Sequence, residues 1–175
     1  MFENPKQKQI LSCMTDVLNQ NGFRAKLIDA AENNLMMMRA ETQRLGKVGK
    51  EAVIDLCFIP VQLPGEDEGL LQFYITVFSE LPEMYKRNIR EVVDYCNDYC
   101  MLGSFGYFEP AGQVFLKYSF LLDGSAALEK NVQLIADNIA LLQASVSRFI
   151  DAIAAAGFSG TPMESLIDMD LLPKM

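Results

Sequence analysis

The sequence predicts an α+β fold in which helices lie before, between and after an antiparallel sheet of five to six strands. Residues 23–78 alternate between apolar and polar side chains with a period of two, and turn-forming residues separate the runs. Helical patterns occupy 5–21, 83–101 and 125–156, and further strand patterns lie between the last two. Because these helices are too few for a repeating β–α–β unit, we expect antiparallel pairing. The predicted element order is α-β-β-β-β-α-β-β-α.

The first part of the chain is predicted to hold one helix and four strands. Pro5 favours the first turn of the helix, apolar side chains follow at helical spacing, and Gly22 ends it. Glu32-Asn33-Asn34 is typical of a turn, and Gly46 and Gly49 mark another. The four strands are predicted over 23–29, 35–42, 52–61 and 70–78.

The middle of the chain is predicted to hold a helix and a hairpin. Pro82 opens the helix 83–101, and Gly103 ends it. The hairpin joins strands 105–109 and 113–122 through the sequence Glu109-Pro110-Ala111-Gly112. Proline in second place and glycine in fourth are typical of a type I turn.

The last part of the chain is predicted to be a long helix followed by a short one. Ser125 is expected to cap the long helix and Gly157 to end it. Thr161-Pro162-Met163-Glu164 is typical of a capping box, which predicts a helix over 162–168 that docks on its own domain. The chain is therefore predicted to be one domain, 1–157, with a short helical tail, 158–175.

Composition and charge indicate which partners and which compartment to expect. The chain has 175 residues, of which 50% are hydrophobic, and its formal net charge is −8. This charge opposes binding to nucleic acid and to anionic membrane surfaces, whereas it favours a basic protein partner. The start of the chain has no cationic segment followed by an apolar run, and we expect no window of about 18 apolar residues. We therefore expect a cytoplasmic protein whose four cysteines are thiols.

The sequence DYCNDYC places two of the four cysteines, Cys96 and Cys100, four residues apart on the middle helix. They could belong to a metal site, a redox pair or the core. Ile89 and Val93 continue the same helical stripe, and free cysteine behaves as a small hydrophobic residue. The spacing is also not that of the CxxC redox motif. We therefore predict that both cysteines are buried, reduced and free of metal.

The sequence gives little support for catalysis or for a cation-binding site. The chain contains no histidine, which excludes Ser-His-Asp and Cys-His catalysis and removes the commonest general base. Glu66, Asp67 and Glu68 could bind a hard cation, but adjacent carboxylates in a loop favour a solvated turn. The sequence therefore predicts no catalytic residue, no cofactor and no metal site.

The long helix carries an unbroken heptad seam that predicts a partner surface. A helix of about 30 residues is about 45 Å long, whereas typical strands span about 17–20 Å, so part of the seam should stay uncovered. In strand 113–122, Phe115 and Leu121 face away from the side that carries Val114 and Leu116. We predict a homodimer that buries either Val146, Phe149 and Ile153 of the helix or the sheet face near Phe115 and Leu121. The alternative is a monomer whose helices cover everything. The seam comprises Leu128, Val132, Ile135, Ile139, Leu142, Val146, Phe149 and Ile153.

The element order, and above all VVDYCNDYCMLGSFGYFEPAGQVFLKYSFLL at 92–122, resembles the YbjN-like family, whose members are described as sensory transduction regulators of bacteria. Asn97 stands at the position of an asparagine in the family pattern, and Cys96 replaces an aliphatic residue before it. The resemblance implies the fold of type III secretion chaperones, which are protein-binding modules and often dimers. It brings no catalytic residues.

Together, the residues and the resemblance predict a non-catalytic protein-binding module, chaperone-like or regulatory, of a bacterial cytoplasm. The alternative is a small-molecule-sensing or carboxylate-based enzymatic domain with a pocket against the sheet.

Overall fold

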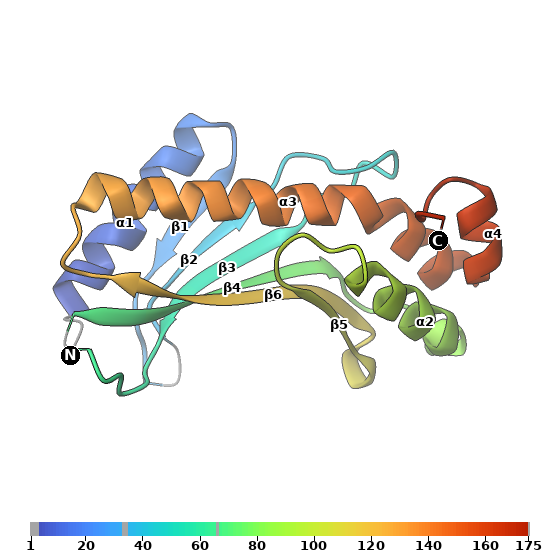
Figure 1. Cartoon of the computed structure of the whole chain (residues 1–175), viewed down its shortest axis with the longest axis horizontal. Helices are drawn as coiled ribbons and strands as arrows, with labels where there is room; N and C mark the ends of the chain where they lie inside the picture. The colour runs from blue at the N-terminus through green and yellow to red at the C-terminus, as the bar shows by residue number, and fades with distance from the viewer. Residues whose placement is uncertain (1–3, 33–34, 66, 175) are drawn as a thin grey trace. The chain divides into compact units, whose positions relative to one another are not determined.

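The computed structural model describes residues 4–32, 35–65 and 67–174, and it confirms the α+β class and the predicted element order (Figure 1). Within these residues a six-stranded antiparallel sheet has the order β1-β2-β3-β4-β6-β5, so β1 and β5 are its edges. Asn33, Asn34 and Glu66, which belong to predicted loops, lie outside the described residues. The strands are β1 Arg24–Ile28, β2 Met37–Glu41, β3 Val53–Ile59, β4 Glu68–Phe78, β5 Ser104–Phe108 and β6 Gln113–Asp123. The helices are α1 Asn4–Gln20, α2 Lys86–Asn97, α3 Leu128–Ser159 and α4 Met163–Asp168, with the single 3-10 turns η1 Glu83–Tyr85 and η2 Glu109–Ala111.

The chain folds into two compact units, and each unit takes its parts from separate stretches of sequence. The described parts of 1–43, 53–74 and 118–140 form the first unit, and the described parts of 44–52, 75–117 and 141–175 form the second. Residues 158–175 are therefore part of the second unit. The division into a domain 1–157 and a tail stays a prediction.

In the first unit, α1 packs on one face of β1, β2 and β3, and Figure 1 shows this helix beside the first strands. Strand alternation explains which side chains meet it. Met38 and Ala40 of β2 and Ile54 and Leu56 of β3 lie opposite one another in register and are fully buried. The side chains of the intervening residues, such as Arg39, point to the other face.

In the second unit, α2 lies against β5, and α4 contacts α2. The chain end is held in place because the Tyr95 hydroxyl donates a hydrogen bond to the Pro173 carbonyl (2.7 Å). Leu166 of α4 and Leu172 after it are buried. The prediction that the terminal helix docks on its own chain is therefore confirmed.

A carboxylate of α3 fixes the turn between β2 and β3. The two oxygens of Asp151 accept hydrogen bonds from the backbone N–H groups of Lys47 (2.9 Å) and Val48 (2.8 Å). Gly46, beside these residues, has a φ of +63° and leaves no room for a Cβ next to Ile150. The turn therefore depends on a helix that lies more than 100 residues later in the chain.

Both predicted ends of the long helix are wrong. α3 begins at Leu128 and not directly after Ser125, the predicted cap. The N–H (2.8 Å) and hydroxyl (2.6 Å) of Ser125 donate hydrogen bonds to the Asp123 side chain. At its other end α3 continues through Gly157, where a Cβ would lie 2.9 Å from the Leu81 side chain. The helix instead ends before Gly160, whose φ is +63°.

The predicted capping box of the terminal helix is also wrong. Pro162, in an extended conformation with ψ of 152°, occupies the N-cap position of α4, and no side chain bonds the cap. The N–H of Thr161 donates to the Ala155 carbonyl at 3.2 Å, so this residue still closes α3.

The heptad seam of α3 is covered by the chain itself, so the prediction that part of it stays uncovered is wrong. Every seam residue from Val132 to Ile153 is at most 7% exposed. In the second unit, the Phe105 ring of β5 packs against Phe149, with ring centroids 5.9 Å apart.

The composition of α3 also corrects the expectation about long apolar windows. Among the described residues, α3 is the helix that, by length and composition alone, is long and apolar enough to cross a membrane. Half of that stretch of α3 is buried inside the chain.

Candidate functional site

The face of the first unit's sheet opposite α1 carries side chains that are half-exposed or exposed, and we call it the open face. Strand pairing places these side chains in rows that run across β1, β2 and β3. One row is Lys26, Arg39 and Asp55, and the neighbouring row is Ile28, Met37 and Cys57. Polar and apolar rows are thus segregated along the strands.

The polar row neutralises part of its own charge. Arg39 donates two hydrogen bonds to Asp55, from Nε at 2.6 Å and from Nη2 at 2.8 Å. In the adjacent row, Arg24 pairs with Glu41 on the neighbouring strand. Such paired charges orient a partner more than they attract one.

The apolar row continues beyond the paired part of the strands. Leu35, two residues before Met37, is 39% exposed. Ile59, at the end of β3, is half-buried. We define the apolar end of the open face as Ile28, Leu35, Met37, Cys57 and Ile59.

Two groups near Asp55 remain uncharged at neutral pH. Burial, followed by the negative charge of Asp55, raises the pKa of the Cys57 thiol above its ordinary value. The same two causes raise the pKa of the Tyr74 hydroxyl. Cys57 therefore contributes to the apolar end as a protonated, weakly polar side chain.

The structure separates the five residues that the sequence assigned to a partner surface. Leu121 is 54% exposed in the first unit, two residues after Ser119, which accepts a hydrogen bond from Gln72. In the second unit, the half-buried Phe115 ring lies over Gly106, where a Cβ would be 2.4 Å from the ring. These two residues stay candidates for a partner surface.

For Val146, Phe149 and Ile153 the prediction is wrong. All three are at most 1% exposed, and the Phe149 ring meets the Phe105 ring edge-on, with centroids 5.9 Å apart. A partner cannot reach them while the second unit is folded. The sequence missed the apolar end of the open face, although the alternation of Leu35, Met37, Arg39 and Glu41 already places these residues on one face.

The second unit contains a pocket of about 860 Å³ beside the hairpin of β5 and β6. The hairpin turn is confirmed: Gly112 donates to the Glu109 carbonyl at 3.0 Å and has a φ of +56°. The turn is tied to the segment after β4, because Leu81 donates to the Gly112 carbonyl at 2.9 Å. The pocket is lined by Glu80, Leu81, Glu83, Arg90, Tyr107, Phe108, Glu109, Pro110, Ala111 and Gly112.

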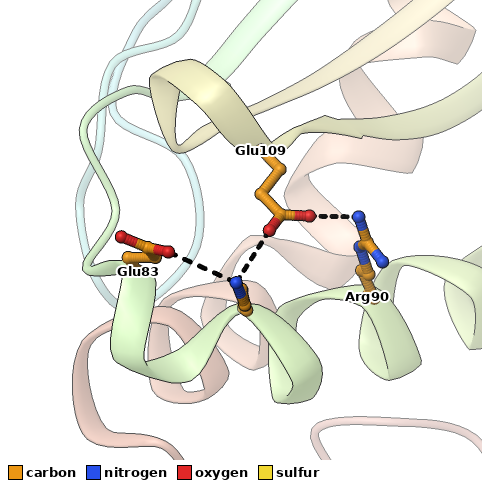
Figure 2. Close-up of polar contacts among 4 residues, drawn as sticks. Glu83, Arg90 and Glu109 are labelled. Carbon is orange, nitrogen blue, oxygen red and sulfur yellow. Dashed lines mark hydrogen bonds and ion pairs between the residues drawn. The ribbon is translucent and has the colours of Figure 1, made fainter.

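A carboxylate in this pocket is held between two cations (Figure 2). Glu109 pairs with Lys86 at 3.0 Å and also with Arg90, and Lys86 further contacts Glu83 at 3.2 Å. The hydrogen bond from Lys86, together with the charge of Arg90, lowers the pKa of Glu109. A general acid needs a raised pKa, so this arrangement favours an anion that ties the hairpin to α2.

The Tyr107 hydroxyl oxygen is buried and has no hydrogen-bond partner among the described residues. Because an unsatisfied buried hydroxyl is costly, we expect Tyr107→Phe to raise the free energy of unfolding by about 1 kcal/mol in urea denaturation. The matched control is Tyr95→Phe, which removes the hydrogen bond to the Pro173 carbonyl and should lower the free energy of unfolding by about 1 kcal/mol. A loss of stability in Tyr107→Phe would show that its hydroxyl has a partner.

The two cysteines of DYCNDYC differ in their surroundings. Cys96 is fully buried, as predicted, and burial, followed by the nearby Cys100, raises the pKa of its thiol to about 12. Cys100 is only half-buried, because α2 already ends at Asn97, and its thiol donates to the Leu102 carbonyl at 3.2 Å. The prediction of burial is therefore wrong for Cys100. Within the described residues, no cluster of three or more His, Cys, Asp or Glu side chains could hold a metal ion.

No protein-family model and no curated protein matches this chain. The resemblance to the YbjN-like family stays a prediction. The site is therefore interpreted from its own geometry.

Proposed function

We propose that this chain is a non-catalytic protein-binding module, chaperone-like or regulatory, of a bacterial cytoplasm, and that its open face binds the partner. The observation that carries the proposal is the apolar end of the open face. There Ile28, Met37 and Cys57 lie side by side on three strands, and the exposed Leu35 precedes Met37 by two residues. An antiparallel sheet normally turns polar side chains to the solvent, so adjoining apolar ones favour a binding surface.

A second copy of this chain is the partner that we propose first. Two such faces can pack against each other as sheets do, with strands nearly aligned and apolar side chains between them. The paired charges of Arg39 with Asp55 then lie beside the apolar contact and help to set its orientation. A client protein would use the same surface, and the net charge of −8 favours a basic one.

Light scattering tests this proposal. We expect a mass of twice 19.6 kDa at micromolar concentration, and we expect Leu35→Asp to return it to 19.6 kDa. Val48→Asp is the matched control, because Val48 is 47% exposed but belongs to the second unit. A wild-type mass of 19.6 kDa would reject the homodimer, and a doubled mass that survives Leu35→Asp would reject the open face.

The alternative function, a small-molecule-sensing or carboxylate-based enzymatic domain, is supported by the pocket of the second unit. Its volume of about 860 Å³ is within the range of small-molecule sites. The ion pairs of Glu109 with Lys86 and Arg90 favour sensing over acid catalysis in that pocket.

A further inference from the structure

An asparagine side chain occupies the free edge of β1. The amide of Asn19, in the last turn of α1, accepts a hydrogen bond from the Ala25 N–H (2.8 Å) and donates one to the Ala25 carbonyl (3.0 Å). The amide therefore pairs with Ala25 as the backbone of a neighbouring strand would. Gly22, with a φ of +84°, turns the chain between the helix and the strand and brings the two residues together.

The free edge of β5 has the same arrangement in the second unit. Asn97, the last residue of α2, accepts a hydrogen bond from the Phe105 N–H (2.7 Å) and donates one to the Phe105 carbonyl (3.0 Å). Here too a glycine with positive φ, Gly103 at +76°, lies between the helix and the strand. The two edge strands of the sheet thus carry the same contact, although their sequences differ.

Strand geometry shows how many of the outward hydrogen-bonding positions on each edge this contact occupies. In an antiparallel pair, the N–H and C=O of one residue both point to the neighbouring strand or both point away from it, and successive residues alternate. Because Asn19 binds both groups of Ala25, the outward residues of the five-residue β1 are Ala25 and Leu27. By the same argument, the outward residues of β5 are Phe105 and Tyr107. One of the two outward positions on each edge is therefore occupied.

We infer that Asn19 and Asn97 close the two edges of the sheet against the addition of a further strand. A strand that adds to an edge needs consecutive outward N–H and C=O groups, and five-residue strands with one blocked position leave a single outward residue. A partner of this chain is thereby directed to a face of the sheet and away from its edges. The inference rests on these hydrogen bonds alone and holds whether or not the open face binds a second copy.

Self-association of alanine variants tests this inference. We expect Asn19→Ala and Asn97→Ala, and the double variant most, to form species larger than the wild type in light scattering, increasingly with concentration. The matched controls are Asn21→Ala and Asn88→Ala. Each removes an asparagine hydrogen bond of the same unit, to the Val17 carbonyl (2.8 Å) or the Gly160 carbonyl (2.9 Å), without opening an edge. Both controls should keep the wild-type mass.

Hydrogen exchange of the two protected amides gives a second readout. In Asn19→Ala, the exchange of the Ala25 amide should accelerate by roughly tenfold, since its acceptor is removed. If Asn97→Ala fails to fold, as judged by circular dichroism, Asn19→Ala decides, because its hydrogen bonds lie at the exposed surface. Edge variants that keep the wild-type mass would overturn the inference. It would also be overturned if the controls associated equally, or if Ala25 exchanged no faster.

Discussion

Phe149→Asp is expected to abolish folding of the chain and not merely to split a dimer. The side chain is 1% exposed and packs edge-on against Phe105. Loss of a buried phenylalanine costs about 3–5 kcal/mol, and a carboxylate buried without a partner adds to this. Since natural domains are stable by about 5–15 kcal/mol, little folded protein should remain. Far-UV circular dichroism and urea denaturation measure the effect.

Met84→Asp is the control for this prediction, because Met84 is 78% exposed and lies in the same unit as Phe149. Its free energy of unfolding should stay within about 0.5 kcal/mol of the wild type. Phe149→Leu provides an intermediate case that keeps an apolar side chain and should still fold. A stable, folded Phe149→Asp protein would contradict the burial of α3 and would restore its seam as a candidate partner surface.

Gly112→Ala should be the most damaging of the single-methyl substitutions at the glycines of the hairpin. A Cβ at this position would lie 2.5 Å from the carbonyl oxygen of Leu81 and 2.7 Å from its nitrogen, and backbone atoms cannot rotate away. The φ of +56° adds strain for any residue with a side chain. We expect a loss of about 3 kcal/mol in the free energy of unfolding, measured by urea denaturation.

Gly49→Ala separates the two causes. Gly49 has a similar φ of +62°, but a Cβ there would be 3.8 Å from its nearest neighbour, Arg44. Its substitution should therefore cost only the conformational strain, about 1 kcal/mol. Equal losses in the two variants would show that the contact with Leu81 contributes nothing.

The order of helices and strands could be predicted because each element has its own local signal. Alternation at 52–61 and the turn at Glu109-Pro110-Ala111-Gly112 need no knowledge of the rest of the chain. The ends of the helices were harder to predict from the sequence. Gly157 reads as a helix stop, yet the Leu81 side chain occupies the space where its Cβ would be, and the helix continues to Ser159. A contact between residues so far apart in sequence has no local signature.

The candidate site was predicted only in part for the same reason. Leu121 and Phe115 could be assigned to a separate face from alternation within one strand. The apolar end of the open face needs the register of β1 with β2 and of β2 with β3, which places Ile28, Met37 and Cys57 side by side. Val146, Phe149 and Ile153 were assigned to a partner because the length of the helix was compared with that of a typical strand, although the strands predicted over 70–78 and 113–122 are longer.

The interleaving of the two units has a consequence for synthesis on the ribosome. The first unit needs 118–140, and the second needs both 44–52 and 141–175, so neither can be completed before about four fifths of the chain has been made. This protein therefore cannot fold vectorially, that is, by forming an amino-terminal domain while the rest of the chain is translated. A transcript truncated before α3 would yield no smaller stable domain but a polypeptide without the buried apolar residues that α3 supplies, a substrate for cellular holdases and proteases.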